Sequence, residues 1–180
     1  YIGSCEKIEY MFPKAHAAAY VMMAWRIAYC KLYYPLEYYT AYFSVRADNF
    51  SYGTMCQGKE ALELTMRQMI ARSDLLSKKE QDTLKDMRSV QEMYARGFEF
   101  VPIDLKVAQA NKFTIVDGKI MPALSSIDGL GVKAAESIAN AVRAEKLLSI
   151  DELKKKAGIG DSVIAMLDQF GILKGMPKSD

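Results

Sequence analysis

Apolar residues recur at helical spacing through the first part of the chain. Between residues 14 and 34, positions 17, 20, 21, 24, 28 and 32 are apolar, and this spacing predicts one long helix. Pro13 can occupy the first turn of this helix, and Pro35 ends it. Because proline suits the first turn of a helix, Pro35 also predicts a second helix over residues 36–45.

End signals predict two further helices. Gly53 and Gly58 bracket a loop, and a third helix should cover residues 59–71. The run Ser77-Lys-Lys-Glu80 has the pattern of a capping box, in which the two outer side chains bind the first amides of a helix. It predicts a fourth helix to about residue 95, which Gly97 stops.

The second half of the chain is marked by turn residues. Phe113-Thr-Ile-Val116 and Lys119-Ile-Met121 flank Asp117-Gly118, which predicts a β-hairpin with a two-residue turn. After Pro122, a short helix, a glycine hairpin and a longer helix occur twice. The expected elements are a turn or short helix at 123–127, glycine hairpins at 128–131 and 158–160, and helices at 132–144, 149–157 and 161–170.

These patterns predict a mainly α fold with two helical modules. Nine of the 11 tyrosines lie within residues 1–42, whereas the last third of the chain is aliphatic and rich in glycine. We therefore expect one helical module over residues 1–97, a linker with the β-hairpin over residues 98–121, and a second helical module over residues 122–180.

Composition narrows the chemistry. The net charge of the 180 residues is only +2, and residues 121–180 hold eight basic and eight acidic side chains, so any affinity for nucleic acid must come from local geometry. Cys5, Cys30 and Cys56 are widely spaced and His16 is the single histidine, which argues against a zinc site or a disulfide framework. The most apolar stretch, residues 17–30, is too short and too charged to cross a membrane. The cysteine usage suits a reducing cytosol, so we expect a cytoplasmic protein.

The glycine hairpin at Gly129-Leu-Gly131 carries the most specific chemistry. Two glycines allow a tight turn and a close approach of the backbone to a ligand, and the next helix presents free amides at its positive end. Ala135 is small where two helices must meet. This is the helix–hairpin–helix pattern, which implies binding of duplex DNA through phosphates without base specificity. The candidate DNA-binding residues are Gly129, Leu130, Gly131, Val132 and Lys133.

The second hairpin, around Gly158 and Gly160, leaves two alternatives. It binds the opposite DNA strand, or it only completes the fold. The first hairpin has an alternative as well, because two glycines can also form a plain helical turn.

The segment from Tyr10 to Tyr20 offers a second candidate site. Lys14 and His16 stand at the predicted start of the first helix, where their side chains and the free amides suit a triphosphate. Tyr20 lies one helical turn after His16. The pattern by itself favours a packing role for a lone histidine. The spacing of these residues alone therefore does not establish a nucleotide-binding role.

Several longer motifs resemble the fingers region of the PolC-type bacterial DNA polymerase III, a member of the alpha-subunit family. They are Met11-Phe-Pro-Lys-Ala-His-Ala-Ala-Ala-Tyr20, Arg26-Ile-Ala-Tyr29, Tyr42-Phe-Ser-Val-Arg-Ala-Asp48, Glu92-Met-Tyr-Ala-Arg-Gly-Phe98 and Pro102-Ile-Asp-Leu105. The resemblance covers nearly the whole chain. The resemblance suggests that the chain is a piece of a longer protein and corresponds to the carboxy-terminal part of the proteins in that family.

The resemblance implies a part of a replicative DNA-directed DNA polymerase, a nucleotidyltransferase. Its fingers would lie over the incoming deoxynucleoside triphosphate, with Lys14, His16 and Tyr20 as nucleotide-binding candidates. Arg26 and Arg46 would contact the template or support the fold, and the Met- and Tyr-rich helices would be packing elements. Primer–template DNA would be held by the helix–hairpin–helix module.

The family's catalytic aspartates, which bind Mg²⁺ in a palm domain, have no counterpart in this sequence. Asp48, Asp86 and Asp104 are isolated and are predicted to be caps or solvated surface residues. We therefore expect no catalytic residue, no metal site and no activity of this chain alone. The family binds a sliding clamp through a terminal motif, and the run to Pro177-Lys-Ser-Asp180 does not contain one.

Two other functions are compatible with the residues. A non-enzymatic helix–hairpin–helix module of a repair protein would keep the Gly129 hairpin and leave residues 10–20 as packing. A helical interaction scaffold would bind no nucleic acid.

Overall fold

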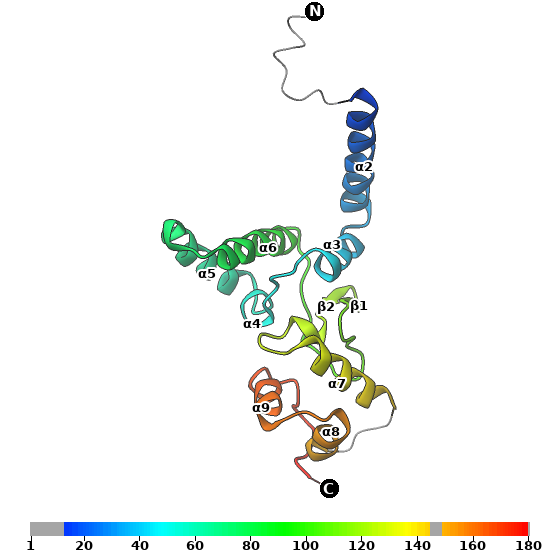
Figure 1. Ribbon diagram of the computed structural model, residues 1–180, viewed down its shortest axis with the longest axis vertical. Coiled ribbons are helices and arrows are strands. Elements are labelled where there is room, and N and C mark those ends of the chain that lie inside the picture. Colours follow the sequence, from blue (N-terminus) through cyan, green and yellow to red (C-terminus); the bar gives the residue numbers. More distant parts are fainter. Residues whose placement is uncertain (1–12, 145–148, 180) are drawn as a thin grey trace, which may run out of the picture.

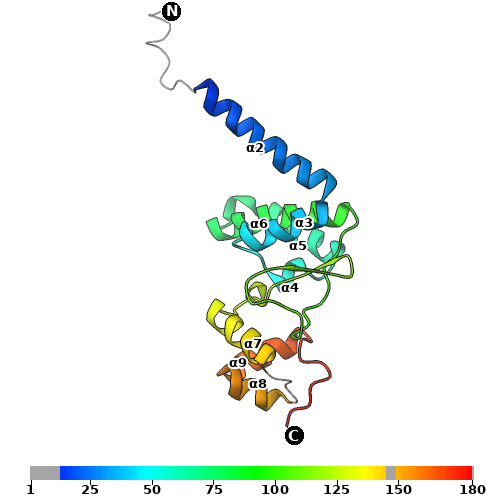
Figure 2. The same cartoon turned by 90° about the vertical axis from the view of Figure 1, so that its right-hand side faces the viewer.

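The computed structural model describes residues 13–144 and 149–179. They form a long, mainly helical molecule, as expected from the sequence, with α2 at one end and α7 to α9 at the other (Figures 1 and 2). The helices are α2 (Lys14–Tyr33), α3 (Pro35–Val45), α4 (Tyr52–Met55), α5 (Lys59–Ala71), α6 (Lys78–Ala95), α7 (Val132–Ala144), α8 (Ile150–Ala157) and α9 (Asp161–Gln169), with 3₁₀ turns η1 (Ser73–Leu75) and η2 (Leu124–Ser126).

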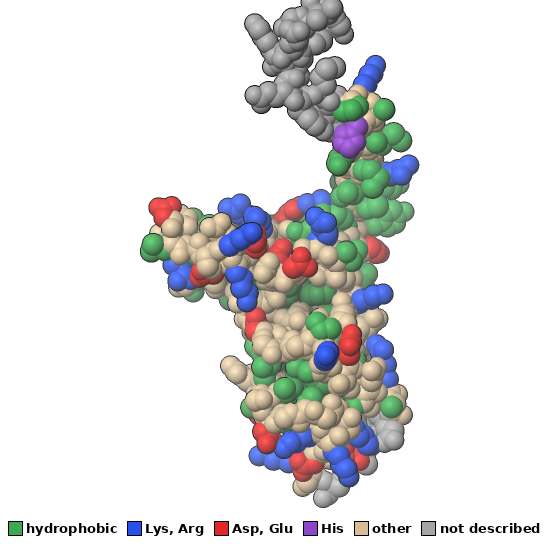
Figure 3. All heavy atoms as spheres, in the orientation of Figure 1, with side chains coloured by type: hydrophobic (Ala, Val, Ile, Leu, Met, Phe, Trp, Pro, Cys, Tyr) green, Lys and Arg blue, Asp and Glu red, His purple; other side chains and the backbone are tan. Residues whose placement is uncertain are grey.

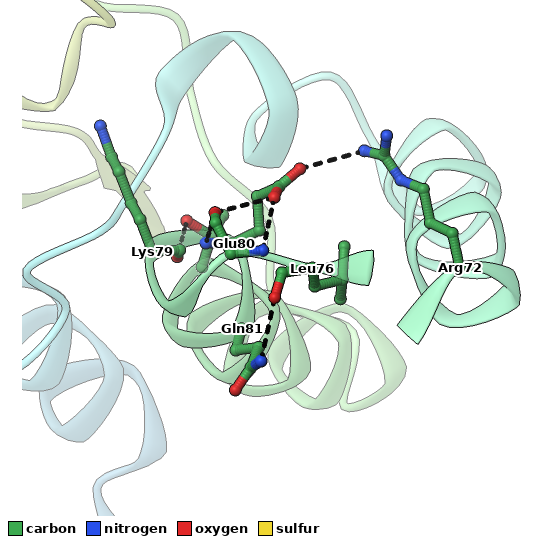
Figure 4. Close-up of polar contacts among 7 residues, drawn as sticks. Arg72, Leu76, Lys79, Glu80 and Gln81 are labelled. Atoms are coloured by element: carbon green, nitrogen blue, oxygen red, sulfur yellow. Dashed lines mark hydrogen bonds and ion pairs between the residues drawn. The ribbon is translucent and has the colours of Figure 1, made fainter. Parts of the chain in front are cut away.

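The capping box at the start of α6 is confirmed. The Ser77 hydroxyl accepts a hydrogen bond from the Glu80 amide at 3.3 Å, and Glu80 Oε2 accepts one from the Ser77 amide at 2.9 Å. Figure 4 shows that Arg72, at the end of α5, reaches the other Glu80 oxygen, at 3.2 Å. These contacts close the turn between the two helices, and α5 and α6 extend together to one side of the molecule (Figure 1).

The predicted β-hairpin is also confirmed. Strands β1 (Thr114–Val116) and β2 (Lys119–Met121) pair in antiparallel register, and both turn residues have positive φ, 50° at Asp117 and 74° at Gly118. Only a residue that tolerates this left-handed conformation can hold such a turn.

Two clusters of buried apolar side chains meet at β2. Neighbouring strand residues point to opposite faces, and accordingly Ile120 belongs to one cluster and Met121 to the other. The first cluster contains α3, α5 and α6 residues such as Phe43, Met66 and Met87. The second joins Tyr52 to residues of α7, α8 and α9. Each cluster therefore contains residues that precede the β-hairpin in the sequence and residues that follow it.

Helix α2 differs from the expected packing helix. None of its residues is buried, and Trp25 is 76% exposed. Figure 3 shows apolar side chains along the helix as it leaves the body of the molecule. The helical spacing was predicted correctly, but the prediction that this helix packs into a core was wrong, because no other described segment of the chain covers it. No described helix is long and apolar enough to cross a membrane.

A second correction concerns Gly53, which was expected in a loop. It lies inside the short helix α4, whose first turn is capped by Ser51 through a 3.2 Å hydrogen bond from the Thr54 amide. The predicted loop is therefore divided by a turn of helix. Four residues form too little helix to be stable in isolation, so α4 depends on the tertiary contacts of Tyr52 and Met55, which are both buried.

Candidate nucleic-acid interface

The hairpin between η2 and α7 turns sharply at two glycines. Gly129 has a φ of +83°, and the Leu130 amide donates to the Ile127 carbonyl at 3.0 Å. The Leu130 side chain is 6% exposed and packs in the second cluster, which also contains the fully buried Ala135. Ala135 is small and buried, as expected where two helices meet. Leu130, one of the DNA-binding candidates, anchors the hairpin from inside, because its side chain is buried and its amide is bonded.

The backbone on the outer side of this hairpin is open. Gly129, Gly131, Val132 and Lys133 are exposed, and within residues 13–144 and 149–179 their amides have no hydrogen-bond acceptor. The first amide bonded in the manner of the helix is that of Ala135, which donates to the Gly131 carbonyl at 3.0 Å. The first turn of α7 contains no acidic residue. A set of free donors at the positive end of a helix is suited to a phosphate.

The two glycines serve different purposes. A β-carbon at Gly129 would meet the Met166 methyl group at 3.0 Å, and its φ is one that other residues rarely adopt. A β-carbon at Gly131 would meet nothing within 4 Å, and Gly131 has no positive φ. Gly129 is therefore required by the fold, whereas Gly131 leaves space on the outer surface.

The second hairpin differs from the first because an acidic residue lies in the first turn of the helix that follows it. Gly158 ends α8 with a φ of +62°, and Gly160 leads into α9. Asp161 follows in the first turn of α9 and forms an ion pair with Lys154. Its carboxylate lies at the helix end where a phosphate would have to bind. The geometry of the two hairpins is similar, but the first is better suited to an anion.

The first hairpin is tied to α4 by a contact that the sequence did not predict. Asp128 Oδ2 accepts a hydrogen bond from the Gly53 amide at 2.8 Å. Next to this bond, the rings of Tyr52 and Phe170 meet edge to face, with centroids 5.3 Å apart. No local pattern joins residues 75 positions apart, so this contact could not be found without the tertiary structure.

The three nucleotide-binding candidates all lie on the first two turns of α2. Lys14 is its first residue, and the rings of His16 and Tyr20 meet edge to face with centroids 4.5 Å apart. All three side chains are exposed. The start of α2 lies at one end of the molecule and points away from α7, so the two candidate sites are far apart (Figure 1). Residues 10–12, the first part of the predicted segment, lie outside the described residues.

At its other end, α2 is held by a polar cluster. Lys31 Nζ donates to Glu92 at 2.7 Å, and Arg96 donates to the Lys31 carbonyl at 2.9 Å. Burial alone would raise the pKa of the Glu92 carboxyl, but Lys31, Tyr39 and Arg96 together hold that pKa below its usual value. Burial and the Glu92 carboxylate raise the pKa of Tyr39 to about 12. The position of α2 therefore depends on charged and polar contacts.

The acidic residues do not form a metal site within the part of the chain that is described. Asp86 is a further correction, since it is neither a cap nor a solvated residue. It is 6% exposed and accepts a hydrogen bond from the Asn49 amide at 3.1 Å, and its burial raises the pKa of its carboxyl. Of the cysteines, Cys30 and Cys56 are free, and Cys5 lies outside the described residues.

No family model matches the chain. It is 41% identical over all 180 residues to the DNA polymerase III PolC-type of Caldanaerobacter subterraneus subsp. tengcongensis, of which it covers 13%. It is 43% identical over 180 residues to the protein of that name from Clostridium perfringens, and 45% identical over 177 residues to that from Staphylococcus saprophyticus, covering 12% of each. Along its whole length, the chain therefore matches a segment of PolC-type DNA polymerase III that makes up 12–13% of those relatives.

Proposed function

We propose that this chain is the part of a replicative DNA-directed DNA polymerase that grips duplex DNA and contacts the incoming nucleotide. One observation supports the DNA grip above all others. Gly129, Gly131, Val132 and Lys133 are exposed residues at the start of α7, which is 13 residues long, and their amides have no acceptor among residues 13–144 and 149–179. The name of the relatives supplies the reaction, a template-directed transfer of a nucleotide to a primer end.

The hairpin would hold one phosphate, or two adjacent ones, through its backbone amides. The Lys133 side chain, in the first turn of α7, adds a positive charge beside them. Such contacts fix the position of a duplex and do not read its bases. Because the module carries as many acidic as basic residues, we expect weak binding that falls steeply with salt.

The nucleotide would be bound at the start of α2. Lys14 and His16 would contact the triphosphate, and Tyr20 would stack or hydrogen-bond beside them. Positioning of phosphates and neutralisation of their charge are a large part of what proteins contribute to phosphoryl transfer. Mg²⁺ would assist at carboxylates that we do not assign to this chain, since its described residues contain no suitable cluster. Sliding-clamp binding stays an expectation for the longer polymerase.

A binding experiment tests the DNA grip. Fluorescence anisotropy with a short labelled duplex at low salt compares the wild-type chain with Gly131→Ala and Gly131→Asp. A β-carbon at residue 131 meets no other atom, and aspartate is favourable near a helix start, so both variants should fold. We expect Gly131→Ala to weaken binding and Gly131→Asp to abolish most of it.

The matched control is Gly160→Ala in the second hairpin, where a β-carbon meets only the Ser162 hydroxyl, at 3.9 Å. It should bind DNA like wild type, because Asp161 already occupies that helix end. If Gly131→Asp binds as tightly as wild type, the DNA grip is wrong and a helical scaffold is the better interpretation.

A protection experiment tests the nucleotide site in the full-length polymerase. Acylation of Lys14 is followed by mass spectrometry with and without a deoxynucleoside triphosphate on primer–template DNA. We expect protection of Lys14 and none of Lys79, an exposed lysine at the start of α6. Equal labelling of Lys14 in both conditions would favour a module that binds DNA alone.

A further inference from the structure

The residue that precedes the DNA-binding hairpin makes a contact across the molecule. Asp128 lies between the buried Ile127 and the left-handed Gly129, and its carboxylate accepts the Gly53 amide at 2.8 Å. A β-carbon at Gly53 would come within 3.1 Å of that oxygen and 3.2 Å of the Phe170 ring. The absence of a side chain at residue 53 is what allows α4 and the hairpin to approach so closely.

The Gly53 amide needs a partner from outside its own helix. It is the second residue of α4, and the first amides of a helix have no acceptor within the helix. Ser51 satisfies the Thr54 amide, and Asp128 satisfies the Gly53 amide. The hairpin therefore supplies a cap to a helix that packs between the two buried clusters.

On charge alone, this carboxylate is unfavourable for DNA binding. It lies one residue before the amides that would hold a phosphate, and like charges repel at such distances. Asp128 favours DNA binding only if the gain in affinity from holding the hairpin in place exceeds the loss from its negative charge. The two effects predict opposite results when Asp128 is replaced, which makes them separable.

We propose that Asp128 is a positioning residue for duplex binding, because its bond to Gly53 fixes the hairpin amides relative to α4. This inference rests on the proposed function of the hairpin. The loss of the oxygen acceptor should let the hairpin move and weaken binding, whereas the loss of the charge with the acceptor kept should strengthen it.

The test compares Asp128→Asn with Asp128→Ala by anisotropy over a series of salt concentrations. The two variants have the same charge, but only asparagine keeps an oxygen for the Gly53 amide. We expect Asp128→Asn to bind at least as tightly as wild type and Asp128→Ala to bind about three- to tenfold more weakly than Asp128→Asn. The matched controls are Asp168→Asn and Asp168→Ala on α9, an exposed acid, which should bind alike.

Two further measurements make the result decisive. Asp128→Glu keeps the charge but moves the oxygen by one methylene, so it should bind more weakly than wild type even if Asp128→Ala fails to fold. If the Asn and Ala variants, or the Glu variant and wild type, bind equally, Asp128 does not position the hairpin. Gly131→Asp, measured in the same series, separates the positioning role of Asp128 from the DNA-binding role of the hairpin. An unchanged affinity of Gly131→Asp would disprove the DNA-binding role itself.

Discussion

The Lys31 ammonium group lies 2.7 Å from a carboxylate oxygen of Glu92, and this ion pair joins the last turn of α2 to α6. Arg96 strengthens the junction, since it donates to the Lys31 carbonyl, one of the last carbonyls of α2. Because α2 has no buried residue, its direction depends on this junction more than on a core. The nucleotide-binding candidates lie at the opposite end of the same helix.

Replacement of Glu92 by glutamine should loosen this junction in a pH-dependent way. The pKa of Glu92 is lowered in the folded chain, so its stabilisation is present above the unfolded value of about 4.3 and is lost as the pH falls through the lowered folded value. At pH 7 we expect a loss of at most about 1 kcal/mol, because the pair is partly exposed. Urea unfolding of wild type and Glu92→Gln at pH 7 and at acidic pH measures this loss of unfolding free energy. Glu63→Gln, in the looser 3.9 Å pair with Arg67, should cost less.

Replacement of Ser77 by alanine should weaken the start of α6. It removes the acceptor of the Glu80 amide, and loss of such a cap costs about 1 kcal/mol. Hydrogen bonds from the Ser77 amide and hydroxyl lower the pKa of Glu80, so the contribution of Glu80 is present at neutral pH and fades in acid. The midpoint of urea unfolding measures the effect, and Ser73→Ala is the control on the preceding turn. Equal midpoints for the two variants would contradict the role of the cap.

Asp86 should show the opposite dependence on pH. Its burial raises the pKa of its carboxyl in the folded chain, so folding binds a proton and stability falls as the pH rises from the unfolded pKa through the raised folded value. Asp86→Asn, which keeps an oxygen for the Asn49 amide, should therefore be as stable as wild type or more stable at pH 7, and this advantage should shrink in acid. Asp86→Ala leaves that amide unpaired and should cost about 1–3 kcal/mol. Thermal unfolding at two pH values distinguishes these outcomes.

Replacement of Gly129 by alanine should destabilise the second cluster. The φ of +83° and the Met166 methyl group at 3.0 Å both oppose a β-carbon, and the left-handed conformation alone costs about 1–2 kcal/mol. Gly131→Ala is the matched control, two residues away in open space, and should leave the melting temperature nearly unchanged. If the two variants melt at the same temperature, Gly129 does not form a left-handed turn.

Several features could be predicted from short stretches of sequence because their causes are local. The Ser77–Glu80 capping box, the Asp117-Gly118 turn and the stop at Pro35 depend on residues within one turn of each other. The same is true of the Gly129 hairpin, whose exposed amides follow from its glycines and the helix after them. The spacing of His16 and Tyr20 likewise places their rings together.

The sequence by itself therefore determined the longer helices, the β-hairpin and the glycine turn before α7, since backbone conformation and the amides at a helix start are set by near neighbours. Only the tertiary structure decided that Asp128 caps α4, that Asp86 is buried and that the apolar α2 is exposed. Burial and capping from afar depend on which distant segments pack together. That choice is made by the summed contacts of the two clusters, and no local pattern records it.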